Sequence, residues 1–403
     1  MIRRFLFLFT LLSLFACHTE EVSNTSPGTP FIEDLRQEFA PDKRVARWFI
    51  QDTMEEGQLV LRGETNLPQA KGILLTQLEA TGIPFLDSIE LLPSSNLEGK
   101  LYGLVNVSVA NIRSEDKHWG EMASQVLLGT PLKILKKVRE GWYYVQSPDG
   151  YLGYLDQGAL VLLDETAFQD WQQSPKVIYW KDYGFSTLLP DPNSQRISDL
   201  VIGALMKKGV SDASHTEVIY PDGRTAFVPT QDVKTMPEWL DQASTEPDDI
   251  IATAKKFVGR PYLWGGTSGK GMDCSGFTKT VFYLHGMILQ RDASQQVHTG
   301  IEIPTDSTLA GLQKGDFLFF GRITAEQKEK ITHVGIYMGD GLFIHSGDDN
   351  PGIRIQSLKP GTPNFAPHRL ASLMRARRMW AEPGKHKVEL IKDSEFYSSS
   401  VLD

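Results

Sequence analysis

Residues 271–278 read GMDCSGFT and contain Cys274, one of only two cysteines in 403 residues. An apolar stripe at helical spacing predicts a helix from Cys274 to about His285, and the stripe consists of Phe277, Val281 and Leu284. Asp273 is the expected N-cap of this helix. Because a helix N-terminus favours negative charge, we expect a thiol pKa that is lowered toward the reactive range. Position alone leaves open whether Cys274 is a nucleophile, a metal ligand or a buried apolar residue.

The composition of the chain is that of a globular protein with several domains. A hydrophobic fraction of 41% with 10% aromatic residues fits a packed core, and the length suggests about two to four domains. The net charge of −9 argues against nucleic-acid binding, which requires a basic face for the phosphates. Beyond the N-terminus there is no apolar run of about 18 residues, so no internal membrane span is expected.

Residues 1–17 have the pattern of an export signal. Arg3 and Arg4 precede the apolar run FLFLFTLLSLFA, which is too short to span a membrane, and Cys17 follows it. The sequence LFAC at 14–17 resembles the lipobox of bacterial lipoproteins, which predicts lipidation of Cys17 and a membrane anchor. The alternative is an ordinary cleaved signal. In both cases we expect an exported protein of the bacterial cell envelope in which Cys274 has no disulfide partner.

The rest of the chain divides by composition and pattern. Pro-Asp-Gly turns at 148–150 and 221–223 each separate two short strands, which predicts two small antiparallel barrels that resemble bacterial Src-homology-3-like domains. Residues 68–82 and 249–259 each predict a helix, and Asp249 is the expected cap of the second. The last third favours an α+β domain with helices packed on an antiparallel sheet. The predicted order is a signal with lipobox at 1–17, a polar tether at 18–30, a small α/β module at 31–97, barrels at 98–163 and 164–232, a linker at 233–248, the α+β domain at 249–380 and a polar tail at 381–403.

A cysteine nucleophile needs a histidine base and a third group that orients the base. His333 opens the strand-like stretch HVGIYM, and His345 lies in the next one, LFIHSG. A two-residue Asp340-Gly341 turn between them would put the histidines on opposite faces of the sheet. A three-residue loop at 339–341 would pair His345 with Gly335 and put both histidines on one face. We predict the three-residue loop.

Five stretches within residues 249–378 together resemble the catalytic domain of NlpC-type peptidoglycan cysteine peptidases, a papain-like superfamily. They are GRPYLWGGTSGKGMDCSGF, QRDASQQ, LQKGDFLFF, THVGIYMGDGLFIHSG and MRARR. The resemblance implies that Cys274 is the nucleophile, His333 the base and His345 the residue that orients the base. It implies acyl transfer from an amide, with neither a cofactor nor a metal.

The resemblance also implies the substrate. The family cuts peptidoglycan stem peptides, typically between the γ-carboxyl of D-glutamate and the following diamino acid. Members with Src-homology-3-like domains commonly act on muropeptides with a free N-terminal L-alanine, and an amine of this kind needs carboxylate partners. The implied substrate-binding residues are Asp292 for the amine, Glu121 and Tyr151 from the first barrel, and Asp273, Ser275 and Trp264 along the cleft. Asp292 as a loop or cap carboxylate and Glu121 as a solvated surface residue remain open.

Three other functions remain open. Cys274, His333 and His345 could bind zinc in a hydrolase. The barrels could make the chain a non-catalytic wall-binding lipoprotein, and the same fold could act as an amidase or acyltransferase. We expect a monomer whose partners are a peptidoglycan stem peptide or muropeptide and, through the lipid, the membrane.

Overall fold

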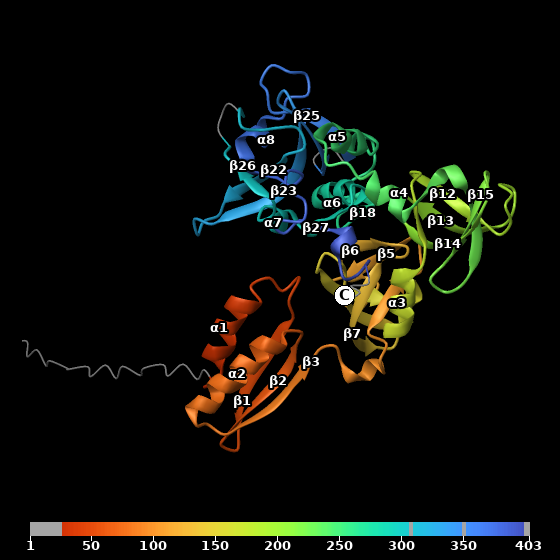
Figure 1. Ribbon diagram of the computed structural model, residues 1–403. Coiled ribbons are helices and arrows are strands. Elements are labelled where there is room, and N and C mark those ends of the chain that lie inside the picture. The colour runs from red at the N-terminus through yellow and green to blue at the C-terminus, as the bar shows by residue number, and fades with distance from the viewer. Residues whose placement is uncertain (1–25, 306–308, 349–351, 399–403) are drawn as a thin grey trace, which may run out of the picture.

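Figure 1 shows the computed structural model, which describes residues 26–305, 309–348 and 352–398. Cys17 and the predicted export signal lie outside the described residues. A three-stranded module and two seven-stranded sheets precede a C-terminal part built on a six-stranded sheet. None of the helices in the described ranges is both long and apolar enough to cross a bilayer.

The N-terminal module packs two helices on a small mixed sheet. Strand β2 pairs antiparallel with β1 and parallel with β3. The helix predicted at 68–82 is confirmed, and Gly82 ends it with a left-handed φ of 72°. The elements are α1 Thr29–Phe39, β1 Trp48–Glu55, β2 Gln58–Thr65, α2 Pro68–Thr81 and β3 Phe85–Leu91.

The first seven-stranded sheet lies between the N-terminal module and the C-terminal domain (Figure 1). Its strand order is β10-β4-β7-β8-β9-β5-β6, and all of its strand pairs are antiparallel. The strands are β4 Tyr102–Val105, β5 Val109–Arg113, β6 Met122–Leu127, β7 Pro131–Arg139, β8 Trp142–Gln146, β9 Leu152–Asp156 and β10 Leu160–Leu163. The Pro-Asp-Gly turn at 148–150 joins β8 to β9, as the sequence predicts.

A second seven-stranded sheet follows the helix α3 Glu165–Gln173, in the order β13-β12-β16-β15-β14-β11-β17. The strands are β11 Lys176–Tyr179, β12 Tyr183–Thr187, β13 Arg196–Val201, β14 Leu205–Ser211, β15 His215–Ile219, β16 Thr225–Pro229 and β17 Val233–Thr235. The linker predicted at 233–248 is wrong, because β17 completes this sheet and α4 Met236–Asp241 follows at once. Trp239 of α4 is fully buried and bonds to the Leu284 carbonyl, which explains why this polar stretch is ordered.

The C-terminal domain has the predicted architecture of helices on an antiparallel sheet, and its sheet order is β21-β26-β22-β23-β24-β25. The helix predicted from Asp249 begins two residues earlier, because Pro247 occupies its first turn. The helices are α5 Pro247–Lys255, α6 Cys274–Leu284, α7 Ala293–Gln296 and α8 Pro367–Ser372. The strands are β21 Ile301–Ile303, β22 Phe317–Ile323, β23 Glu329–Gly339, β24 Leu342–Gly347, β25 Gly352–Ser357 and β26 Leu373–Arg378, with two short pairs, β18 Thr267–Ser268 with β19 Gly271–Met272 and β20 Met287–Ile288 with β27 Glu389–Leu390.

Residues 381–403 are predicted to be a polar tail without a pattern, and for the part that the structure describes, 381–398, this prediction is wrong. Strand β27 pairs with β20, which follows α6, the helix that begins at Cys274. Four apolar side chains of the segment are buried in the same core as α6, namely Val388, Ile391, Phe396 and Tyr397. Single apolar residues among many polar ones give no periodic signal, so the burial is visible only in three dimensions.

The hairpin of β23 and β24 places His333 and His345 on one face of the sheet, as predicted. Ile336 pairs with Ile344, and the continued register sets His345 opposite Gly335. A Cβ built on Gly335 would lie 3.0 Å from the Cβ of His345, which confirms the close approach of the two positions.

The connection of this hairpin differs from the predicted three-residue loop. Asp340 and Gly341 form a two-residue turn with φ values of 53° and 79°, and Gly339 pairs with Leu342. Such a turn alone would put the histidines on opposite faces. Met338 is an extra residue in β23 where the register shifts, and this bulge restores the pairing.

Helix α6 starts in close contact with the loop before it. A Cβ built on Gly276, in its first turn, would lie 2.0 Å from the carbonyl oxygen of Gly266. Only glycine allows this approach, so the GMDCSGFT motif fixes where the helix meets the loop.

We expect Gly276→Ala to destabilise the protein by about 2–4 kcal/mol, because the carbonyl of Gly266 must move. Gly72 is a matched control, since it occupies an exposed position of α2 with no atom within 4 Å of a built Cβ. Gly72→Ala should stabilise by about 0.5–1 kcal/mol through helix propensity. Urea unfolding followed by tryptophan fluorescence measures both, and equal effects of the two variants would contradict the packing argument.

Candidate active site

Cys274 is the first residue of α6, and Asp273 caps the helix as predicted. The Asp273 carboxylate accepts a hydrogen bond of 2.7 Å from the Gly276 N–H. The backbone N–H groups of Ser275 and of Val334, which directly follows His333 in β23, lie close enough to the sulfur of Cys274 to lower the pKa of the thiol. The nucleophile candidate therefore lies beside the strand that carries the base candidate.

The expected lowering of the Cys274 pKa is wrong. Burial is the largest effect, the negative charge of Asp273 is the next, and together they raise the pKa of the thiol to about 12. The two backbone N–H groups and the Arg291 guanidinium act in the opposite direction but do not offset them. The thiol is therefore protonated at neutral pH, and a reaction through sulfur requires a base at the moment of attack.

A chain of hydrogen bonds runs from His333 to a residue that the sequence did not single out. His333 Nε2 lies 2.8 Å from His345 Nδ1, and His345 Nε2 lies 2.7 Å from the side-chain oxygen of Gln356 on β25. A carboxamide oxygen can only accept, so His345 donates from Nε2 and accepts at Nδ1. His333 then donates from Nε2, and its Nδ1 carries the lone pair. The chain fixes His333 as a proton acceptor.

The protonation state of His333 agrees with this geometry. The ring is buried, and burial, followed by the charge of His345, lowers the pKa of His333 well below its usual range. His333 is therefore neutral at pH 7, as the protonated thiol of Cys274 is. The resting site holds a neutral cysteine and histidine pair.

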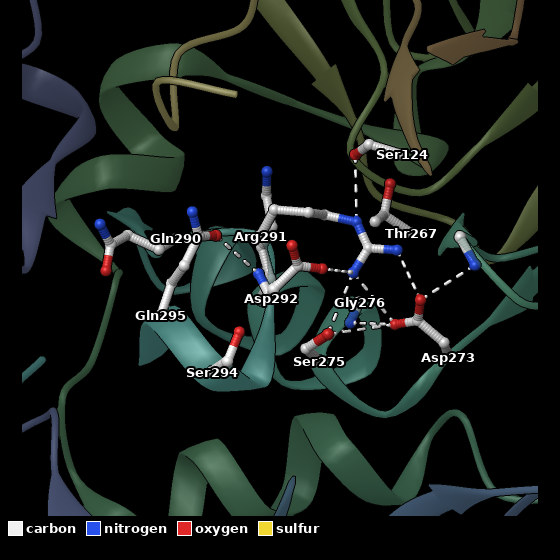
Figure 2. A network of polar contacts seen from close by, with 12 residues as sticks. Ser124, Thr267, Asp273, Ser275, Gly276, Gln290, Arg291, Asp292, Ser294 and Gln295 are labelled. Carbon is white, nitrogen blue, oxygen red and sulfur yellow. Dashed lines mark hydrogen bonds and ion pairs between the residues drawn. The ribbon is translucent and has the colours of Figure 1, made fainter. Parts of the chain in front are cut away.

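Arg291 is the centre of a buried polar network that includes Asp273 and Ser275, the two residues that flank Cys274 (Figure 2). Only 1% of its side chain is exposed, and its guanidinium donates hydrogen bonds to both oxygens of Asp273, at 3.1 Å and 2.5 Å. The guanidinium also donates to Ser275 at 3.0 Å and to Ser124, a residue of β6 in the first seven-stranded sheet, at 3.1 Å. Asp273 and Ser275, both predicted to line the cleft, therefore lie within this network, and their contact with substrate stays a prediction.

Asp292 and Tyr151, predicted from separate parts of the chain, are neighbours. Burial and then the charge of Asp292 raise the pKa of the Tyr151 phenol. Asp292 caps the short helix α7, and its backbone N–H bonds to the side-chain oxygen of Gln295 (Figure 2). An oxygen of Asp292 also lies 2.7 Å from the guanidinium of Arg44, which belongs to the N-terminal module.

Trp264 of the C-terminal domain also contacts Glu121, which directly precedes β6 of the first seven-stranded sheet. The indole N–H of Trp264 donates to a Glu121 oxygen at 2.8 Å, although 64% of the tryptophan side chain is exposed. Glu121 is exposed but has this specific partner, so it is more than a solvated surface residue.

Sequence reasoning missed three residues that the fold brings to the site, namely Gln356, Arg291 and Arg44. Arg291 directly precedes Asp292 in the motif QRDASQQ, so its neighbourhood could have been noticed. Tyr262 is a fourth, since after burial the charge at Cys274 is the largest influence that raises the pKa of its phenol. Gln356 and Arg44 have no local sequence signal.

The zinc alternative has little geometric support. The rings of His333 and His345 are bonded to each other through Nε2 and Nδ1, so these two nitrogens do not converge on a common point. Throughout the ranges that the structure describes, no three His, Cys, Asp or Glu side chains group as metal ligands would.

Comparison with known proteins places two parts of the chain in described families. Residues 259–366 match the NlpC/P60 family, and residues 112–160 match the bacterial dipeptidyl-peptidase SH3 domain. A gamma-D-glutamyl-L-lysine dipeptidyl-peptidase of Bacillus cereus is 29% identical over 263 residues, which cover 62% of this chain and 75% of that protein. Dipeptidyl-peptidase 6 of Lysinibacillus sphaericus is 27% identical over 274 residues, which cover 65% of this chain and 93% of that protein.

A solved structure gives the same result for the fold. The crystal structure of an NlpC/P60 family protein from Bacillus cereus superposes with a TM-score of 0.59 at 25% identity. The match covers 69% of this chain and 99% of that one.

The neutral resting pair predicts the pH dependence of alkylation at Cys274. A raised thiol pKa means that the rate with iodoacetamide keeps rising with pH beyond about pH 8, where an ordinary thiol is already half ionised. Mass spectrometry of the Cys274 peptide against time measures the rate. A plateau reached between about pH 5 and pH 7 would instead reveal a preformed thiolate.

Proposed function

The chain contains an NlpC/P60 cysteine-peptidase domain beside a bacterial dipeptidyl-peptidase SH3 domain, and on this premise we propose that it hydrolyses peptidoglycan stem peptides or released muropeptides between D-glutamate and the diamino acid. The observation that carries the proposal is the chain of hydrogen bonds that makes His333 an acceptor in β23, the strand that lies beside Cys274. The name of the Bacillus cereus relative supports the bond that is cut, and the name of the Lysinibacillus sphaericus relative supports a dipeptidyl-peptidase.

Catalysis starts from the neutral pair. His333 Nδ1 takes the proton of Cys274 as the sulfur attacks the γ-carbonyl carbon, and a tetrahedral oxyanion forms. The C–N bond then breaks while His333 returns the proton to the leaving amine. Water, activated by the same nitrogen, hydrolyses the thioester and releases the D-glutamyl product with the free enzyme. His345 and Gln356 hold the tautomer and the orientation of His333 through both steps.

The oxyanion needs donors that point to it before the reaction. The backbone N–H of Cys274, at the N-terminus of α6, is one donor, because the first N–H groups of a helix have no partner within the helix. We infer that Tyr262 is the second, since its backbone pairs with Met272, two residues before Cys274, and the charge at Cys274 raises the pKa of its phenol.

We infer that Asp292 and Tyr151 recognise a free N-terminal L-alanine, a role that fits the dipeptidyl-peptidase names of the relatives. Trp264, held by Glu121, forms an exposed wall of the cleft, and Asp273 and Ser275 support the cleft from below. Such a site suits the turnover or recycling of wall fragments. An exported chain with a lipid on Cys17 would act as a monomer anchored in the envelope, where peptidoglycan is found.

The direct test compares L-Ala-γ-D-Glu-L-Lys with its N-acetylated form, with products identified by mass spectrometry. We expect release of L-Ala-γ-D-Glu from the free-amine peptide, with kcat/KM at least about tenfold lower for the acetylated one, since the acetylated peptide has no ammonium to pair with the half-buried Asp292. Equal cleavage of both peptides would refute the amine requirement alone. Cys274→Ala should lower kcat by about a thousandfold or more, and full activity of that variant would refute the mechanism.

Gln356 offers a second test, of the hydrogen-bond chain. Gln356→Leu removes the acceptor that fixes the tautomers, so kcat should fall about tenfold or more with little change in KM. Gln356→Glu keeps an acceptor oxygen and should retain most of the activity. If the two variants behave alike, Gln356 has only a packing role.

A further inference from the structure

The N-terminal module reaches the region proposed to read the substrate amine through the loop that joins α1 to β1. Arg44, in this loop, donates from one guanidinium nitrogen to Asp292 at 2.7 Å and to Ser294 at 2.9 Å. Asp292 and Ser294 lie on or beside α7 (Figure 2), 248 and 250 residues further along the chain. Part of the module thus belongs to the site.

The contact of Arg44 with Asp292 is built rather than incidental. The other two guanidinium nitrogens donate to both oxygens of Asp42, each at 2.8 Å, so the side chain has one fixed direction. Asp42 in turn accepts a hydrogen bond of 2.7 Å from Gln295 of α7. The three side chains that bond to Arg44 therefore all belong to α7, cap it or bond to it. They are Ser294, Asp292 and Asp42.

The backbone of the loop is docked as well as its side chains. The carbonyl oxygen of Arg44 accepts from the Leu152 N–H at 2.7 Å, and Leu152 directly follows Tyr151. Val45 lies 3.8 Å from a Cβ built on Gly150. Arg44 therefore occupies a position next to both residues that the proposed function assigns to the amine.

The consequence is electrostatic. An oxygen of Asp292 already has a guanidinium as its partner, and Arg291 lies 4.0 Å from the other oxygen. A substrate ammonium must share Asp292 with Arg44 and approach a like charge, both of which weaken its binding.

We propose that Arg44 is a specificity-determining residue, an internal cation at Asp292 that limits how strongly the enzyme binds a free N-terminal amine. The proposal rests on the proposed function only in taking Asp292 as the partner of the amine. It assigns to the N-terminal module a part in substrate selection, by way of the guanidinium that it holds at the cleft.

The test measures binding in a chain that cannot turn over. Isothermal titration with L-Ala-γ-D-Glu-L-Lys and with its N-acetylated form is carried out on Cys274→Ala and on Cys274→Ala with Arg44→Ala. We expect Arg44→Ala to lower the Kd of the free-amine peptide by about tenfold, and to change that of the acetylated peptide by less than about twofold.

Two further variants separate charge from architecture. Lys43→Ala removes a positive charge from an exposed position of the same loop and should leave both Kd values as they were. Arg44→Lys keeps the positive charge, so its Kd values should be closer to those of the chain with Arg44 than to those of Arg44→Ala. Undocking of the N-terminal module would change the Kd values of both peptides by a similar factor and leave the ratio of these values almost unchanged.

The outcomes distinguish this proposal from the proposed function. The role of Arg44 is overturned if Arg44→Ala leaves the ratio of the Kd of the acetylated peptide to the Kd of the free-amine peptide unchanged or lowers it. It is also overturned if the free-amine peptide binds to neither chain. Cleavage by the chain with Cys274 intact tests the proposed function independently. Selectivity can therefore shift as expected in binding even if the peptide is not the true substrate.

Discussion

The site depends on one buried ion pair, between Arg291 and Asp273. Two charges with almost no exposure are stable together only when their hydrogen bonds are satisfied, and here both carboxylate oxygens and all three guanidinium nitrogens have partners. Asp273 is at once the cap of α6 and the anion of the pair, so the pair sets the position of Cys274. Through Ser124 it also links the first seven-stranded sheet to the start of α6. Loss of either charge would leave the other buried and unpaired.

This constraint explains why the thiol is not activated in the resting state. The carboxylate that caps the helix is one residue from Cys274, and burial, followed by the charge of this carboxylate, raises the pKa of the thiol more than Arg291 and the nearby backbone N–H groups lower it. The neutral state of His333 is the matching half, since burial and the positive side chains around it disfavour an imidazolium. A neutral pair avoids a separated charge in an apolar site while no substrate is present, and it leaves the proton transfer to the step in which the sulfur attacks.

Local patterns in the sequence predicted the parts of the fold that local physics determines. The apolar stripe and Asp273 located α6 and its cap, and the histidine pair was placed on one face of the sheet. The thiol pKa was predicted in the wrong direction because burial depends on the whole domain. The linker and tail were missed because Trp239, Phe396 and Tyr397 are isolated apolar residues that become buried only against distant elements. Arg44 and Gln356 could not be found, since their partners are set by tertiary contacts.

The bulge at Met338 has a consequence for how this hairpin can change in evolution. A side chain on a strand alternates between faces, so the loss or gain of one residue between His333 and His345 would carry one of them to the opposite side. Substitutions at the turn keep the count and preserve the pairing, whereas a single-codon deletion does not. Length changes here are tolerated only in compensating pairs, one at the turn and one at the bulge. Between the two histidines, the number of residues is therefore more constrained than their identity.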